Sequence, residues 1–155
     1  MRFRILSSLD EIPECDIIYS VQHHEILKTQ HIRKARSLAL NLHLAPLPEY
    51  RGCNQFSFAI MDEARSFGVS IHRIDERIDH GALLFEKRFS ISPDIWVEDL
   101  YQKSVNAGIE LFKETLPGNP EQGLSGSGYR YTRPPEPYLL QKRYSGTETH
   151  LGLPG

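Results

Sequence analysis

The sequence is that of a globular protein of single-domain size. It has 155 residues, of which 39% are hydrophobic and 25% are charged, and its formal net charge is -2. This length suits one compact domain, and the composition excludes the fibrous and the disordered classes. A weakly acidic chain creates no positive field that would gather polyanions, so nucleic acid is not favoured as a partner.

Cysteines and apolar runs indicate a reducing, aqueous compartment. Cys15 and Cys53 are too few for a disulfide framework and do not form a CxxC pair, so we expect reduced thiols. No run approaches the ~18 apolar residues of a membrane span, and residues 1–4 are not followed by the apolar core of a signal peptide. We therefore expect a cytoplasmic protein with no membrane partner.

The first half of the chain has the pattern of a strand, a helix and a second strand. Residues 15–21 form a β-branched run typical of a central strand that is buried on both faces. Apolar residues recur at roughly helical spacing over residues 25–35, and residues 37–42 form a second compact apolar run. This order predicts a parallel βαβ unit with a right-handed crossover.

A loop and a second group of elements follow. Two prolines and a glycine over residues 43–52 are incompatible with a regular helix or a central strand, so we expect a loop there. Asn54 is placed to cap a helix that runs to about residue 65. Residues 69–74 and 83–91 then read as strands on either side of a charged turn.

The last part of the chain divides into a helix and a tail. Residues 96–116 carry an apolar stripe at helical spacing, which predicts a long helix that covers the sheet. Residues 117–155 hold seven of the 11 glycines and six of the 10 prolines, which indicates an extended or partly disordered tail. We therefore expect one α/β domain over residues 1–116, with a mostly parallel sheet flanked by helices, followed by this tail.

Two polar residues, Asn41 and His43, end the second predicted strand. Alternation places both side chains on the same side of the sheet, at a carboxyl end, where α/β folds usually build their sites. The pattern alone also fits an asparagine that caps a turn and an ordinary loop histidine. In the same way, Asp79 alone fits a turn aspartate ahead of Gly81.

Two segments decide between these readings. The first is NLHLAPLPEYRG at residues 41–52, and the second is GVSIHRIDERIDHG at residues 68–81. Together and in this order they closely resemble the folate-dependent formyltransferases, a family with glycinamide ribonucleotide, methionyl-tRNA and sugar-amine enzymes. The resemblance covers roughly residues 15–116. It implies a Rossmann-like catalytic domain of one-carbon metabolism that lacks roughly its N-terminal third.

The resemblance implies that Asn41, His43 and Asp79 are catalytic. In formyl transfer an amine attacks the formyl carbonyl, negative charge builds on the oxygen, and a proton leaves the nitrogen. Asn41 and a protonated His43 would donate to that oxygen, while Asp79 would hold His43 charged and relay the proton. The donor would be 10-formyltetrahydrofolate. No metal is required, and no HExxH motif or paired Cys/His spacing supports one.

The resemblance also implies a donor site, in which main-chain groups of two segments grip the folate pterin. The residues concerned are His24, Glu25, Ile26, Leu27, Ile74, Asp75, Glu76, Arg77 and Ile78. Without the resemblance, Ile26 and Leu27 fit the face of a surface helix equally well. His72 matches a histidine that is common in the family, although core packing is the favoured role for it.

The acceptor implied is a primary amine. The wording of residues 43–60 is closer to enzymes that act on amino sugars or related small amines than to the tRNA enzyme. Arg51 would either bind an anionic group of the acceptor or pair with Glu49. Two alternatives stay open: a non-catalytic truncated domain that binds folate or a protein, and a hydrolase that releases formate from the folate. A short sheet would also leave an edge through which a homodimer forms.

Overall fold

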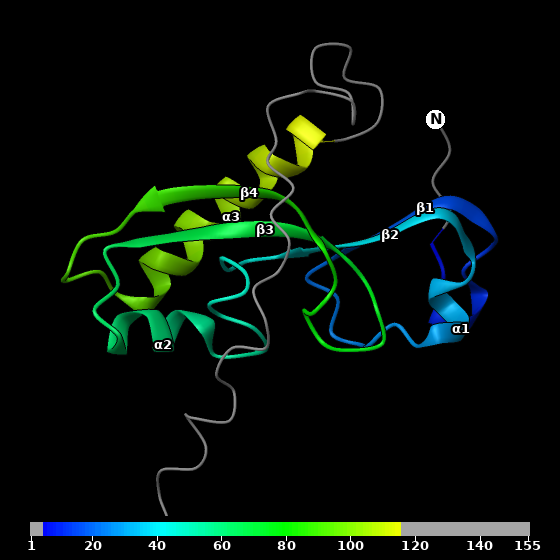
Figure 1. Ribbon diagram of the computed structural model, residues 1–155, viewed down its shortest axis with the longest axis horizontal. Helices are drawn as coiled ribbons and strands as arrows, with labels where there is room; N and C mark the ends of the chain where they lie inside the picture. Colours follow the sequence, from blue (N-terminus) through cyan, green and yellow to red (C-terminus); the bar gives the residue numbers. More distant parts are fainter. Residues whose placement is uncertain (1–4, 116–155) are drawn as a thin grey trace, which may run out of the picture.

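The computed structural model describes residues 5–115, so the tail predicted over residues 117–155 lies outside the described part. The chain forms one four-stranded sheet with a long helix along one face (Figure 1). The strands are β1 (Cys15–Val21), β2 (Ala35–His43), β3 (Ser66–Arg73) and β4 (Leu83–Ser90). The helices are the 3-10 turn η1 (Leu9–Glu11), α1 (Thr29–Ile32), α2 (Gln55–Met61) and α3 (Val97–Thr115). Within residues 5–115, no helix combines the length and the apolar character that a membrane span requires.

The sheet has mixed orientation and the order β1-β2-β3-β4. β1 and β2 pair in parallel, as predicted for the βαβ unit, whereas β3 is antiparallel to both β2 and β4. β1, β2 and β4 therefore run the same way and β3 runs back between them. The predicted α/β class, with a sheet whose strands mostly share one direction, is confirmed.

β1 is an edge strand, and its prediction as a central strand was wrong. It pairs with β2 on one side and has no other strand neighbour among residues 5–115. All of its side chains except Ile18 are at least partly exposed. The continuous apolar run gave the strand's bounds correctly, but such a run does not tell which elements flank it. The strand buried on both faces is β3.

Two helices are shorter than predicted. α1 begins only at Thr29, where the imidazole Nδ1 of His31 accepts the main-chain N–H of Lys28 at 3.2 Å, so residues 25–27 stay outside the helix. Asn54 does precede α2, but it is left-handed (φ 63°) and its side chain makes no capping hydrogen bond. α2 ends at Met61 because Glu63 adopts φ 51° and closes a Schellman-type turn.

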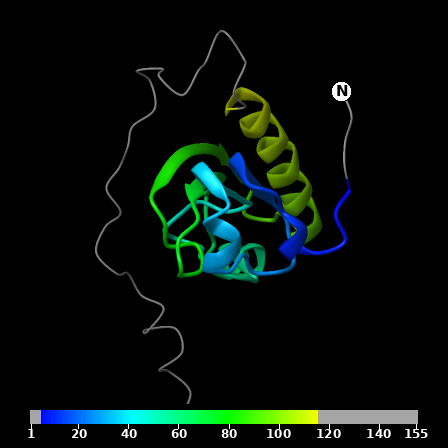
Figure 2. The same cartoon turned by 90° about the vertical axis from the view of Figure 1, so that its right-hand side faces the viewer.

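An apolar core between the sheet and α3 fixes the strands in register. Leu42 of β2 and Ile71 of β3 belong to one buried cluster with Leu111 of α3. Figure 2 shows α3 lying along one side of the sheet, as the apolar stripe over residues 96–116 predicted. The helix comes close because position 108 is glycine: a Cβ there would lie 2.9 Å from Cδ2 of Leu44. Each such Leu or Ile contributes roughly 1.5–3 kcal/mol when fully buried.

Candidate functional site

A cleft of about 510 Å³ lies beside the carboxyl ends of β1 and β2. Its volume falls within the roughly 300–1,000 Å³ range of small-molecule sites. All of the predicted catalytic and donor-binding residues line this cleft: Asn41, His43 and Asp79, with His24, Glu25, Ile26, Leu27, Ile74, Asp75, Glu76, Arg77 and Ile78. The fold thus brings together segments that are far apart in the sequence. The chemical roles of these residues stay a prediction.

Asn41, His72 and Asp79 form a compact polar cluster. Asn41 lies opposite His72 in the β2–β3 register, and its Nδ2 lies 3.1 Å from His72 Nε2 and 3.4 Å from Asp79 Oδ1. His72 Nδ1 donates to the main-chain carbonyl of Arg73 at 2.8 Å, so in the neutral ring Nε2 accepts from the Asn41 amide. His72 therefore orients a predicted catalytic side chain, beyond the core-packing role that the sequence favoured for it.

His43 approaches Asp79 from the other side. Its side chain is only 9% exposed, and its Nε2 lies 2.7 Å from the main-chain oxygen of Tyr50. Because a carbonyl only accepts, Nε2 carries the proton in the neutral ring. Nδ1 then carries no proton, and it lies 3.6 Å from Asp79 Oδ2. The neutral imidazole therefore offers a proton-accepting nitrogen next to a carboxylate.

The protonation states follow from burial and from local contacts. Burial lowers the pKa of His43 below its usual range, and Asp79 and the Tyr50 carbonyl offset this only in part. For Asp79, burial raises the pKa, but the neighbouring His72 and His43 side chains and the Gly52 N–H together bring it below its usual range. At neutral pH the cleft thus pairs an ionised Asp79 with a neutral His43.

The loop of residues 44–52 supplies main-chain groups to the site. The Gly52 N–H donates to Asp79 Oδ2 at 3.0 Å. Asp79 itself has φ 48°, a left-handed conformation that aspartate tolerates better than most residues. The sequence did not reveal these contacts, because a main-chain donor or acceptor leaves no trace in residue type.

A buried hydroxyl fixes the beginning of the same loop. Ser70 on β3 is fully buried, accepts the main-chain N–H of Leu47 at 3.0 Å and donates to the main-chain oxygen of Ala45 at 2.9 Å. The loop start is therefore tied to the strand that also carries His72. Sequence reasoning missed Ser70, since a serine on a strand carries no signal of its partners.

Of the two roles left open for Arg51, the pairing with Glu49 is not the one that forms. Both carboxylate oxygens of Glu49 bind the guanidinium of Arg88 on β4, at 2.7 and 3.0 Å. The Nε of Arg51 is buried and has no hydrogen-bond partner within the described part of the chain. Arg88 comes from a strand distant in sequence, so local spacing gave no hint of this pair.

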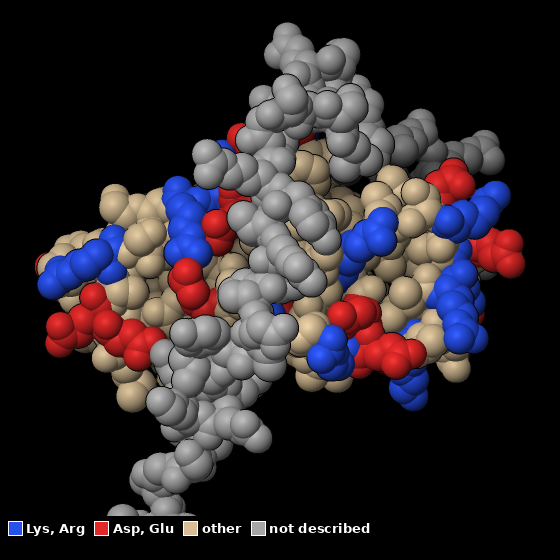
Figure 3. Space-filling view, viewed as in Figure 1, with Lys and Arg blue, Asp and Glu red and all other residues tan. Residues whose placement is uncertain are grey.

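The charges on the surface are mixed in sign. On the face seen in Figure 3, Lys and Arg side chains alternate with Asp and Glu, in line with the formal net charge of -2. Among residues 5–115, no group of three or more His, Cys, Asp or Glu side chains could hold a metal ion.

Comparisons with known proteins give a consistent picture. A sequence profile described as "Formyl transferase" matches residues 5–116. The bifunctional polymyxin resistance protein ArnA of Wigglesworthia glossinidia brevipalpis is 31% identical over 102 residues, which is 66% of this chain and 16% of the relative. An N-formyltransferase from Helicobacter canadensis, solved with folinic acid and dTDP-3-aminofucose, has a TM-score of 0.63 and 27% identity, over 70% of this chain and 40% of its own.

A further solved structure supports the same fold assignment. WlaRD, a sugar 3N-formyl transferase solved in the presence of dTDP and 5-N-formyl-THF, is 31% identical with a TM-score of 0.58. The match covers 63% of this chain and 35% of WlaRD. The chain therefore spans well under half the length of each of these three relatives.

Proposed function

Because the chain belongs to the formyl transferase family, we propose that its cleft takes 10-formyltetrahydrofolate and passes the formyl group to a primary amine. The amine belongs to an amino sugar or to another small molecule. One observation carries the proposal: Asn41, His43 and Asp79, from two distant segments, line a single cleft of ligand size. The folinic acid, 5-N-formyl-THF and dTDP-linked amino sugar named for two relatives support the donor class and the sugar acceptor.

The transfer requires one oxyanion donor and one proton acceptor. The amine nitrogen bonds to the formyl carbon, the bond from that carbon to the donor nitrogen breaks, and a proton passes from the amine to the donor nitrogen. Asn41 turns one amide N–H from His72 or Asp79 toward the oxygen on which negative charge develops. His43 accepts the amine proton at Nδ1, directly or through water, and later returns it to the donor nitrogen.

Asp79 has an electrostatic role in this scheme. Its carboxylate is ionised at neutral pH, and it lies 3.6 Å from the nitrogen of His43 that gains the proton. An opposite charge at that distance favours the imidazolium form as it appears. Protonated His43 then becomes a charge-assisted donor for the same oxyanion.

The proposed donor site consists of two segments that line the same cleft. Residues 24–27 follow β1 without entering a helix, so their main-chain groups are free of helical hydrogen bonding. Ile26 and Ile78 are both exposed and line the cleft, one from each segment. Exposed apolar side chains suit the faces of a flat heterocycle, while main-chain groups suit its edge.

Calorimetry and kinetics on the full chain test the proposal. We expect wild type to bind 5-formyltetrahydrofolate, a stable donor analogue, and to transfer formyl to an amino sugar. Asp79→Ala should retain folding yet lose transfer by roughly a hundredfold or more. Asp16→Ala, which removes an exposed carboxylate on β1, serves as the control and should transfer normally.

The alternatives give different outcomes in the same experiment. Binding of the folate without any turnover would favour a non-catalytic folate-binding domain. Release of formate that does not depend on the amine would favour a hydrolase. Failure to bind the folate analogue would contradict the proposal and the hydrolase alternative alike.

We further propose a homodimer formed through the edge strand β1. The outer edge of β1 has no strand partner among residues 5–115, and edge strands readily pair with another chain. Size-exclusion chromatography with light scattering should give the mass of two chains. The mass of one chain across the accessible concentration range would contradict this expectation.

A further inference from the structure

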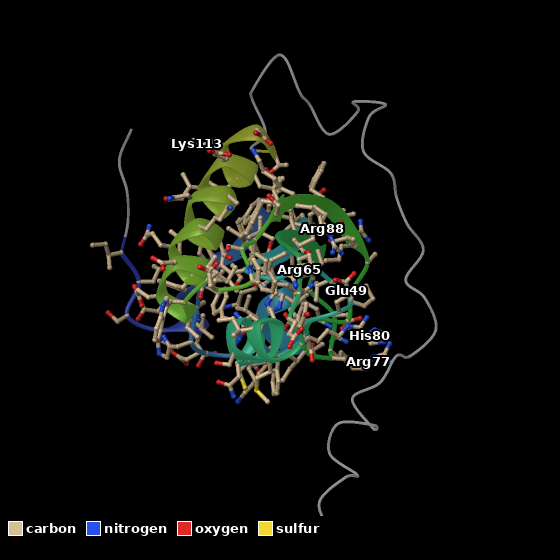
Figure 4. The ribbon with its side chains drawn as sticks, turned by 90° about the vertical axis from the view of Figure 1, so that its left-hand side faces the viewer. Glu49, Arg65, Arg77, His80, Arg88 and Lys113 are labelled. Carbon is tan, nitrogen blue, oxygen red and sulfur yellow. The ribbon has the colours of Figure 1, made fainter. Side chains whose placement is uncertain are left out.

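Two adjacent cations on β4 bind acidic groups on opposite sides of the sheet. Lys87 Nζ contacts Glu110 and Glu114 of α3, at 2.8 and 2.9 Å. Arg88, the next residue, contacts Glu49 of the loop of residues 44–52. Figure 4 shows Arg88 and Glu49 together, away from α3. Lys87 therefore secures the helix, whereas Arg88 secures the loop.

The contact between Arg88 and Glu49 has well-defined geometry. The two terminal nitrogens of Arg88 donate to the two carboxylate oxygens of Glu49, at 3.0 and 2.7 Å, in the bidentate arrangement. The remaining donor, Nε, binds Glu86 on the same strand at 2.9 Å. The guanidinium is thus held on β4 before it reaches the loop, so less side-chain entropy is lost in forming the pair.

Glu49 begins the part of the loop that contacts the predicted catalytic residues. The carbonyl of Tyr50 accepts from His43, and the N–H of Gly52 donates to Asp79. Ser70 fixes only the earlier residues of the loop, through the N–H of Leu47 and the carbonyl of Ala45. The second half of the loop therefore depends on other contacts to keep its main-chain groups in place.

We propose that Glu49 and Arg88 are positioning residues, which hold the Tyr50 carbonyl and the Gly52 N–H against His43 and Asp79. The Glu49–Arg88 ion pair, called the clamp below, is present in the protein without any ligand. Only its effect on catalysis rests on the proposed function. Glu49 and Arg88 do not contact the cleft themselves, since neither lines it. They act through the main chain of the loop.

Hydrogen exchange of the Gly52 amide, measured by NMR on the full chain without ligand, tests the clamp directly. The side chains of Glu49 and Arg88 are 49% and 37% exposed, so solvent weakens their ion pair and its loss should have a modest effect. Glu49→Gln or Arg88→Gln should therefore speed this exchange by about two- to fivefold. The double variant should be no faster than either single one, because both remove the same contact. Arg88→Lys keeps the charge but loses the bidentate geometry, so its exchange rate should lie between those of wild type and Arg88→Gln.

Lys87→Gln is the matched control, since it removes a neighbouring ion pair of the same strand on the other face. It should leave the Gly52 exchange rate at the wild-type value. Unchanged exchange in Arg88→Gln would overturn the proposal. It would mean that the other contacts of Tyr50, its packing on Phe67 and the hydrogen bond from its N–H to the Pro46 carbonyl at 3.1 Å, are sufficient to hold the loop. Equal acceleration by Lys87→Gln would overturn it too, because the effect would then be a general loss of stability.

Kinetics separate this proposal from the proposed function. Where wild type transfers formyl, Arg88→Gln should lower kcat by the same two- to fivefold, with KM for the donor unchanged within about twofold. If wild type transfers no formyl group, the proposed function fails. The hydrogen-exchange rates of the Gly52 amide still show whether Glu49 and Arg88 hold the loop.

Discussion

The two faces of β2 and β3 differ in what they contribute. Toward α3 the strands present Leu40, Leu42, Val69 and Ile71, all within one apolar cluster. Alternate residues of the same strands, Asn41, His43, Ser70 and His72, are polar and are engaged with the cleft or its loop. Because side chains alternate along a strand, two short strands serve both purposes. The comparison teaches that stability and chemistry can be changed separately here, residue by residue.

The largest effect on stability should come from the apolar face. Leu111 of α3 is almost fully buried against β2 and β3, so Leu111→Ala should cost about 2–5 kcal/mol of unfolding free energy. Urea denaturation followed by circular dichroism measures this loss. Formyl transfer per folded molecule should stay close to wild type. A strong loss of transfer in protein that is still folded would break the separation between the faces.

A smaller effect is expected from Ser70, which lies on the cleft-facing side yet contacts only the loop. Ser70→Ala leaves the buried Leu47 N–H without its acceptor, so unfolding free energy should fall by roughly 1–3 kcal/mol. Ser66→Ala, at the exposed start of the same strand, should be nearly neutral when measured in the same way. Equal stability of the two variants would show that the loop does not depend on this hydroxyl.

The smallest effect concerns pH. Burial lowers the pKa of His43 in the folded state below the usual 6.5, so between these two pKa values the unfolded chain binds more protons. Above pH 6.5 the titration of His43 therefore costs no unfolding free energy. As the pH falls from 6.5 toward the folded-state pKa, the unfolding free energy declines. Denaturation at a series of pH values should show this decline in wild type and a weaker one in His43→Gln.

His24→Gln is the control for that series, because His24 is exposed at the mouth of the cleft. The groups that face His43 are Asp79, His72 and the Tyr50 carbonyl, and all three remain in both variants. The prediction fails when His43→Gln and His24→Gln show the same dependence on pH as wild type.

Much of the fold could be predicted from residue patterns. The strands and α3 agree with their predicted ranges to within a few residues, since periodicity and turn residues report local conformation. The edge position of β1 could not be predicted, because pairing partners are set by the whole sheet. The short α1 also escaped prediction, since the side chain of His31 binds the main-chain N–H of Lys28, inside the range that was predicted to be helical.

The candidate site could be predicted in part. Alternation placed Asn41 and His43 on one side, and resemblance to a family supplied Asp79 and the donor-binding segments. The positions of His72 and Ser70 in the site, and the pair of Glu49 with Arg88, depend on contacts between residues distant in sequence. The neutral state of His43 depends on burial, which residue order does not specify.

Formyl transfer by Asn41→Ala is the most direct test of the central claim, that the polar face of the sheet is catalytic. With isotopically labelled 10-formyltetrahydrofolate and an amino-sugar acceptor, turnover should fall roughly a hundredfold or more, as expected for the loss of one oxyanion donor. Asn106→Ala, on the exposed side of α3, should transfer at the wild-type rate. Undiminished transfer by folded Asn41→Ala would contradict the account.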